Sequence, residues 1–158
     1  MTLEELEKSV RELEDLNEIQ NMHREYVFWF NCQQWNEIID CFAENAMTEM
    51  GPHGVQKGKE EIAGLFREVI AKSERYKGRH IVSQPVIDVE GDTARGYWVT
   101  YCFVDIPTAI PKLAVQVVNW EQGRYECEYV KEDGKWKFSY LKWIIPWPEP
   151  EKSVEKPQ

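Results

Sequence analysis

Two polar side chains, Tyr26 and His80, stand where this sequence otherwise places hydrophobic core. Tyr26 belongs to a stripe with helical spacing of three and four residues. The stripe consists of Leu16, Ile19, His23, Tyr26 and Phe30. His80 opens the β-rich run His80-Ile81-Val82-Ser83-Gln84. A phenol and an imidazole brought into one interior can act as an acid and a base, or they can be two core residues whose hydrogen bonds are satisfied.

The elements that would carry the first of these residues are predicted to be helical. Thr2 and Glu5 form a capping-box pattern, so the first helix can begin near Leu3. Its apolar stripe then changes phase, which indicates that residues 1–14 form an arm on the domain or on a partner chain, ahead of a core helix. The other elements expected in this half are helices at about 35–42 and 59–71, a strand at 46–50 and a turn at 51–54.

The second half of the chain is predicted to contain four strands joined mainly by hairpins. Glu90-Gly91-Asp92 and Asp133-Gly134 are typical of hairpin turns. Alternating side chains indicate strands at about 79–89, 93–104, 114–130 and 135–145. Helices followed by antiparallel strands are typical of an α+β fold. Residues 148–158, rich in proline and charge, are expected to be a flexible tail, so residues 1–147 form the single predicted domain.

The composition limits the partners that we expect. The 158 residues suffice for one domain with a sizeable core, and a 13% share of aromatic residues suits either pocket walls or plain core. The formal net charge of −9 would repel nucleic acid and anionic membranes. The sequence contains no apolar run of membrane-spanning length and begins without the basic and apolar segments of a secretory signal. We therefore expect a cytoplasmic protein that binds neither nucleic acid nor membrane.

The cysteines and histidines show no metal-binding pattern. Cys32, Cys41, Cys102 and Cys127 contain no C-x-x-C pair and match no zinc spacing, so reduced and mostly buried thiols are expected. The three histidines also lack ligand spacing, and His53 in Gly-Pro-His-Gly is typical of a solvated turn. We expect no metal and no other cofactor.

Several motifs follow one another in a characteristic order. They are Tyr26 with Asn31 and Trp35, Gly58-Lys59-Glu60-Glu61-Ile62, His80, Gly96-Tyr97-Trp98 and Asp133-Gly134-Lys135-Trp136-Lys137-Phe138. In this order they resemble the nuclear-transport-factor-2-like superfamily, in particular its branch of scytalone dehydratase and bile-acid 7-alpha-dehydratase. The resemblance covers nearly all of residues 10–147. It implies a cystatin-like fold, a cone-shaped barrel of curved, mostly antiparallel sheet packed on three N-terminal helices.

The resemblance also implies a cofactor-free lyase or isomerase. It identifies His80 with the catalytic histidine and Tyr26 with a pocket tyrosine. At other family positions the chain departs from the pattern, with Asn31 in place of an aspartate, Cys102 in place of an aspartate or histidine, and Met50 in place of a second tyrosine. Elimination of water from a β-hydroxy carbonyl compound needs a base at the α-carbon and a donor to the enolate. We predict His80 as general base and acid, Tyr26 as the donor, and Asn31 as the residue that orients the imidazole.

The predicted substrate is a ring-sized, largely apolar hydroxy-carbonyl compound. The residues expected to line its pocket are His23, Phe30, Met50, Tyr101, Cys102 and Asp105. Asp105, at the end of a long strand, is a reserve base of the kind that ketosteroid isomerase uses. Strand register decides whether Tyr101 or Cys102 points inward, because a slip of one residue exchanges the two faces.

Two alternatives to catalysis stay open at the level of the sequence. In the first alternative, the same fold binds a small apolar ligand or acts as an oligomeric scaffold. In the second, the protein has a role in protein interaction. In each case we expect a homodimer or homotrimer, because one sheet face would otherwise expose large aromatic side chains. The candidates for this outward face are Trp98, Trp120, Tyr129, Tyr140 and Trp143.

Overall fold

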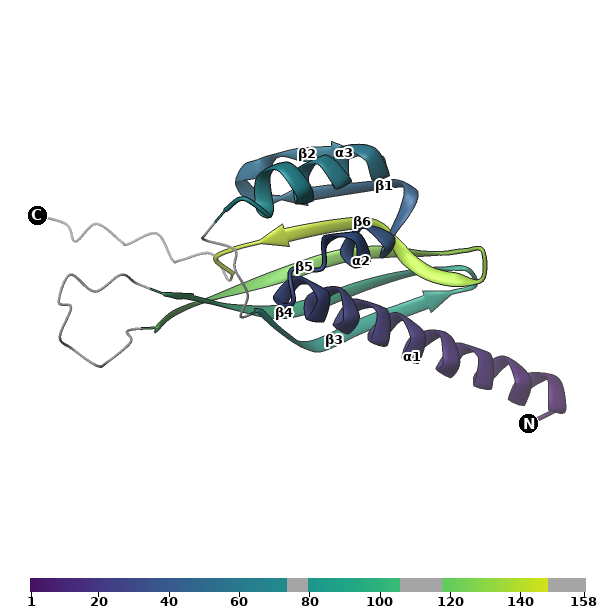
Figure 1. Ribbon diagram of the computed structural model, residues 1–158. Coiled ribbons are helices and arrows are strands. Elements are labelled where there is room, and N and C mark those ends of the chain that lie inside the picture. The colour runs from purple at the N-terminus through teal and green to yellow at the C-terminus, as the bar shows by residue number, and fades with distance from the viewer. Residues whose placement is uncertain (74–79, 106–117, 148–158) are drawn as a thin grey trace, which may run out of the picture.

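The first helix is the longest and lies across one face of the sheet (Figure 1). The computed structural model describes residues 1–73, 80–105 and 118–147. The helix, α1 (Leu3–Asn31), begins with the predicted capping box: the Thr2 hydroxyl accepts a hydrogen bond from the Glu5 backbone N–H, and the Glu5 carboxylate accepts one from Thr2. Residues 3–14 are all exposed and extend beyond the sheet. The predicted arm therefore does not lie on the described part of its own chain.

The second half of α1 buries the face on which the candidate residues lie. Its buried residues are Ile19, His23, Tyr26, Val27 and Phe30, which confirms most of the predicted stripe. This face rests on the sheet at the strands β3 (His80–Glu90) and β6 (Lys135–Ile144). A helix that lies on a sheet through one apolar stripe holds every residue of that stripe in a fixed order along the sheet.

Two short helical elements complete the helical side. They are α2 (Trp35–Asp40) and α3 (Lys59–Gly64), and α3 continues as a π-helical segment, Leu65–Ile70. The helix predicted at 59–71 is thus confirmed as one segment with two hydrogen-bonding patterns. Phe42, predicted at the end of the second helix, instead begins a strand. Its side chain is buried in the core. Phe42 is therefore apolar because its strand position is buried, and not because the helix extends to it.

Within the described residues, six strands form one sheet. Their bounds are β1 (Phe42–Met50), β2 (Val55–Lys57), β3 (His80–Glu90), β4 (Thr93–Asp105), β5 (Val118–Glu132) and β6 (Lys135–Ile144). The order across the sheet is β2-β1-β6-β5-β4-β3, and all neighbours are antiparallel except β1 and β6. The short β2 was not predicted. The mixed α+β class and the mostly antiparallel sheet are confirmed.

The sheet is curved but not closed, so the predicted cone-shaped barrel is an open one. Its edge strands are β2 and β3, and no pairing joins them. The helices cover the concave side (Figure 1). Predictions for the loop with Pro107 and Pro111, for the start of the third long strand at 114–117, and for the tail at 148–158 lie outside the described residues.

The register of β4 decides which aromatic side chains enter the core. Trp98, Thr100 and Cys102 are buried, whereas Tyr97 and Tyr101 lie on the opposite face. The prediction that Trp98 and Tyr129 face outward was wrong, because both are core residues with about 1% exposure. Side chains of β4 alternate between the two faces as predicted, and only the face that points into the core differs from the prediction for Trp98.

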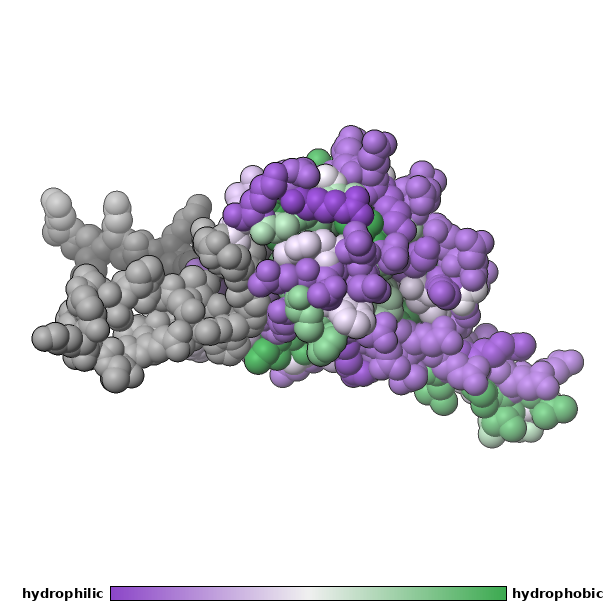
Figure 2. Space-filling model, viewed as in Figure 1, coloured by the Kyte–Doolittle hydropathy of each residue, from purple (hydrophilic) through white to green (hydrophobic). Residues whose placement is uncertain are grey.

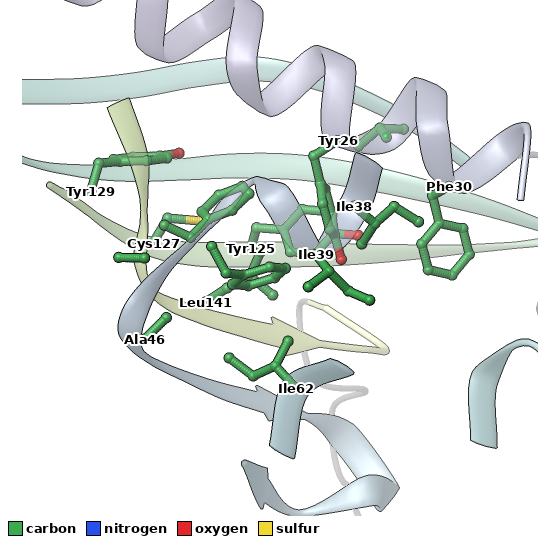
Figure 3. Packing of buried hydrophobic residues seen from close by; sticks show 14 of the residues in the cluster. Tyr26, Phe30, Ile38, Ile39, Ala46, Ile62, Tyr125, Cys127, Tyr129 and Leu141 are labelled. Carbon is green, nitrogen blue, oxygen red and sulfur yellow. The ribbon is translucent and has the colours of Figure 1, made fainter. Parts of the chain in front are cut away.

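The core between helices and sheet is dominated by aromatic rings. Tyr26 contacts Phe42, Phe66 and Phe138 at centroid distances of 5.9, 6.4 and 5.2 Å, in edge-to-face arrangements. Figure 3 shows Tyr26 descending from α1 toward Tyr125, with Phe30 one turn farther along the helix. Such ring pairs add specific geometry to the burial of apolar area, and they leave little free space around the tyrosine.

Candidate active site

A small cavity lies beside His80, at the end of the core. Its lining residues are Phe30, Met50, His53, Ile70, His80, Tyr125 and Trp143. The three members with partial exposure, His53, His80 and Trp143, mark its mouth, and the other four are buried. The cavity volume is about 20 Å³, which is room for about one water molecule. Apolar and aromatic side chains form most of the wall, and its polar groups belong to His53, His80, Tyr125 and Trp143.

The main chain of His80 is held in place by Asn31. The Asn31 side-chain amide donates to the carbonyl oxygen of His80 and accepts from its backbone N–H, both at 2.8 Å. This pair of bonds ties the end of α1 to the start of β3. The sequence predicts that Asn31 orients the imidazole, whereas in the structure its amide bonds to the backbone of His80. An amide has a donor and an acceptor, so it can satisfy both groups of one residue, which a carboxylate cannot.

The imidazole of His80 packs edge-on against Phe30, with centroids 4.6 Å apart. Burial lowers the pKa of His80 to about 4, because the charged form loses hydration. The ring is therefore neutral near pH 7 and can accept a proton. Its Nδ1 atom is buried and has no hydrogen-bond partner among the described residues. A neutral imidazole at a cavity wall with an unpartnered nitrogen is a candidate general base.

Tyr26 lies deeper than His80 and does not line the cavity. Phe30 contacts both rings, at 6.4 Å from Tyr26 and 4.6 Å from His80. The Tyr26 hydroxyl is fully buried, burial raises its pKa, and it has no hydrogen-bond partner within the described part of the chain. The predicted hollow shared by Tyr26 and His80 is thus filled by an aromatic side chain. The two residues lie on the same side of the fold, but not around one open space.

His23 belongs to a buried hydrogen-bond chain, away from the cavity. Trp98 Nε1 donates to the Tyr129 hydroxyl at 2.9 Å, and that hydroxyl lies 2.9 Å from His23 Nδ1. Since Trp98 can only donate, the Tyr129 proton is available to His23 Nδ1, which fits a neutral imidazole protonated at Nε2. Burial lowers the pKa of His23 to about 3. The predicted pocket role of His23 is replaced by a role in the core.

The remaining predicted pocket residues divide between two sides of the sheet. Met50 ends β1 and lines the cavity. Cys102 pairs with His80 across β3 and β4 and faces inward, and burial raises the pKa of its thiol to about 12. Tyr101 faces the other way and lies against Trp120 at 5.7 Å, which excludes it from the interior. Asp105 ends β4 opposite Val118, and its side chain lies outside the described residues.

Sequence reasoning missed four of the cavity residues, which are His53, Ile70, Tyr125 and Trp143. Tyr125 is buried on β5 and lies 6.3 Å from Tyr26 and 5.2 Å from His23, so it joins the cavity to the deeper core. The alternation of β5 could have shown that Tyr125 faces inward. The sequence favours a solvated turn for His53, and only the packing of this turn against β6 brings the residue to the cavity.

The structure shows neither a metal cluster nor a membrane-spanning helix in the parts that it describes. Within residues 1–73, 80–105 and 118–147, no three His, Cys, Asp or Glu side chains are placed to hold a metal ion. No helix in the same ranges is long and apolar enough to cross a membrane. All four cysteines are free thiols.

Comparison with solved structures shows the same fold in several proteins. An NTF2-like protein with a cystatin-like fold from Novosphingobium aromaticivorans has a TM-score of 0.78 at 15% identity, covering 95% of this chain and 93% of that one. A LinA-type3 hexachlorocyclohexane dehydrochlorinase from Novosphingobium barchaimii has a TM-score of 0.72 at 18% identity, covering 95% of this chain and 99% of that one. A provisionally assigned scytalone dehydratase from N. aromaticivorans has a TM-score of 0.71 at 19% identity, covering 87% of each chain.

The sequence comparison places the chain more firmly. A comparison with curated protein sequences gave no match. The profile of the SnoaL-like domain, by contrast, matches residues 11–142, from the exposed arm of α1 through most of β6. The match therefore includes every cavity-lining residue except Trp143. The open curved sheet, the long helix across it and this profile agree, and the chain belongs to the SnoaL-like domain family of the NTF2-like superfamily.

Proposed function

We propose that this protein is a cofactor-free lyase or isomerase in which His80 is the general base. The supporting observation is the neutral imidazole of His80, which lines a mostly apolar cavity and has an unpartnered, buried Nδ1. Two structural neighbours are named as a dehydratase and a dehydrochlorinase, which are both eliminating enzymes. We further propose a cytoplasmic protein that self-associates and acts without a metal.

The proposed reaction is the loss of water from a ring-sized β-hydroxy carbonyl compound. His80 takes a proton from the α-carbon, and the electron pair of the C–H bond moves into the carbonyl group as an enolate. The enolate then expels the β-hydroxyl, which leaves as water once it is protonated. In an isomerase, the enolate is instead reprotonated at another carbon. Both reactions need the same base and the same stabilisation of the enolate oxygen.

A phenol is the proposed donor to the enolate oxygen. Tyr125 lines the cavity, whereas Tyr26 is separated from it by Phe30. Burial raises the pKa of both phenols, so both keep their proton and can donate it in a hydrogen bond. Tyr125 is the donor that a substrate would meet first. Tyr26 would reach the substrate only after Phe30 moves.

The lining supports an apolar substrate, and the small volume sets a condition. About 20 Å³ does not hold a six-membered ring, so binding requires side chains at the mouth to change rotamer. His53 and Trp143 are the partly exposed candidates, because side chains there can move without opening the core.

The test is elimination from 3-hydroxycyclohexanone, followed by the absorbance of the enone product. His80→Gln should lower kcat/KM about 100-fold or more, the usual size of a general-base contribution. Ile81→Gln is the matched control, because Ile81 is the next residue and is 50% exposed. Tyr125→Phe should lower the rate more than Tyr26→Phe. An undiminished rate in His80→Gln would contradict the proposal.

A non-catalytic ligand-binding protein is the competing possibility, favoured by the use of Asn31 on the backbone rather than on the imidazole. The pH dependence separates the two. Because burial lowers the pKa of His80 to about 4, turnover by this base should persist through mildly acidic pH and fall as His80 becomes protonated near pH 4. A passive pocket would bind the compound and release it unchanged at every pH.

A further inference from the structure

A second histidine, His53, faces the same cavity from another part of the fold. His80 begins β3 at one edge of the sheet, whereas His53 lies in the connection between β1 and β2 at the other edge. The curvature of the sheet brings both edges to one cavity, whose lining contains both side chains. Two imidazoles therefore flank the space in which His80 was proposed to act.

The turn that carries His53 is fixed by its backbone and by a partly buried chain of hydrogen bonds. Gly51 and Gly54 have φ values of 53° and 72°, which a glycine adopts without strain. The carbonyl oxygen of His53 accepts a hydrogen bond from Gln56 Nε2 at 2.8 Å, and Gln56 Oε1 accepts one from the fully buried Thr48 hydroxyl at 2.9 Å. A solvated turn does not need such an anchor. The anchor sets the position from which the His53 side chain starts.

Elimination of water requires two proton transfers at different places. One proton leaves the α-carbon, and another must reach the hydroxyl on the β-carbon, because hydroxide is a poor leaving group. A single imidazole could serve both positions only by moving between them. Imidazoles on two walls of one cavity can serve them without moving, and this division of roles is common in acid–base catalysis.

We propose that His53 is the general acid that protonates the leaving hydroxyl, while His80 removes the α-proton. This proposal rests on the proposed function. In the step, an N–H proton of His53 passes to the hydroxyl oxygen, the C–O bond breaks with its electron pair on that oxygen, and water departs. The enolate electron pair forms the new C=C bond. Both histidines are partly exposed, so exchange of protons with solvent restores their starting states.

The leaving group provides the test, because chloride departs without a proton whereas hydroxide does not. The two probes are 3-hydroxycyclohexanone and 3-chlorocyclohexanone, compared by kcat/KM. In His53→Gln the hydroxy-to-chloro rate ratio should fall about 100-fold relative to wild type, the size of a general-acid contribution. In His80→Gln both rates should fall together, so that their ratio changes little. Val55→Gln, an exposed residue after the same turn, is the matched control.

The outcomes separate this inference from the proposed function. If His53→Gln lowers both rates equally, His53 only binds the substrate and the inference is wrong. An unchanged ratio with unchanged rates would make His53 a solvated turn residue, which also overturns it. If wild type eliminates chloride and hydroxide no faster than His80→Gln does, the proposed function itself fails. This outcome does not depend on the result for His53→Gln.

Discussion

Burial lowers the pKa of two histidines, the fully buried His23 and the partly exposed His80, in different surroundings. Each ring has one buried nitrogen, His23 Nε2 and His80 Nδ1, without a hydrogen-bond partner among the described residues. His23 is bonded to Tyr129 inside the core, whereas His80 lies at a cavity wall. Burial alone therefore does not identify a reactive residue. The sequence placed both residues in the interior, because helical and strand periodicity predicts burial. It could not show which one meets a cavity, because that depends on how Phe30 and Tyr125 pack between them.

Stability should fall as the pH drops from about 7 to 5, because of His23. Its pKa is about 3 in the folded protein and about 6.5 when unfolded, so between these values only the unfolded state binds the proton. Lower pH therefore favours unfolding, by on the order of 2 kcal/mol over this range. His80 adds a contribution of the same sign. Urea denaturation at both pH values measures the loss.

The control for this effect is His23→Gln, which keeps a polar side chain toward Tyr129 and removes the titrating ring. Its stability should change about half as much with pH as that of wild type, since His80 still titrates. Carboxylates with lowered pKa values, such as Asp15, contribute to the pH dependence of stability mainly at more acidic pH. Burial raises the pKa of Asp15, but hydrogen bonds from Lys131 and Trp136 lower it by more. A wild-type stability that is flat from pH 7 to 5 would contradict the buried, neutral His23.

At the scale of elements, local periodicity predicted most helices and strands but not their pairing. The long strands of the second half follow one another through hairpins, so neighbours in sequence are neighbours in the sheet. The parallel pair of β1 and β6 joins segments almost a hundred residues apart, and no local pattern encodes it. The inward face of β4 depends on the same long-range packing. The sequence alone therefore could not show whether Tyr101 or Cys102 points into the core.

Two glycines should respond oppositely to alanine, because they meet different neighbours. A Cβ at Gly96 on β4 would lie 2.9 Å from the Tyr129 ring and 3.2 Å from Ile87, so Gly96→Ala should cost about 1–3 kcal/mol. Gly64, at the end of α3, has helical φ and ψ and no atom within 4 Å of that position. Gly64→Ala should stabilise by about 0.5–1 kcal/mol. Thermal denaturation measures both shifts, and equal shifts would contradict the close approach at Gly96.

At the scale of the whole molecule, the candidate site forms where the curved sheet brings its ends together. His53, His80 and Tyr125 come from three separate segments, and each alone is an ordinary turn, strand start or core residue. A resemblance to known enzymes could point to His80, because the resemblance identifies this residue with their catalytic histidine. It could not point to His53 or Tyr125, because their importance arises only from the shared cavity.

The whole molecule also exposes more apolar surface than a monomer needs. On the outer face of the sheet, Tyr97 and Trp120 are 49% and 56% exposed. Figure 2 shows a second hydrophobic area along the protruding end of α1, where Leu3, Leu6, Val10 and Leu13 are exposed. Contiguous apolar areas of this kind are usually covered by another chain. We therefore expect a homodimer or homotrimer, as predicted from the sequence.

The outer sheet face is the area that we expect to be buried in this assembly, since it is broad and the arm is a narrow helix. Trp120→Glu should then shift the native mass at micromolar concentration to that of a monomer, because a charge in a buried interface loses its hydration. Val69→Glu is the matched control, an exposed apolar residue on the helical side. Assembly that survives Trp120→Glu but is lost on removal of residues 1–12 would place the interface on the arm instead. A monomeric wild type would leave Trp120 exposed to water and contradict both arrangements.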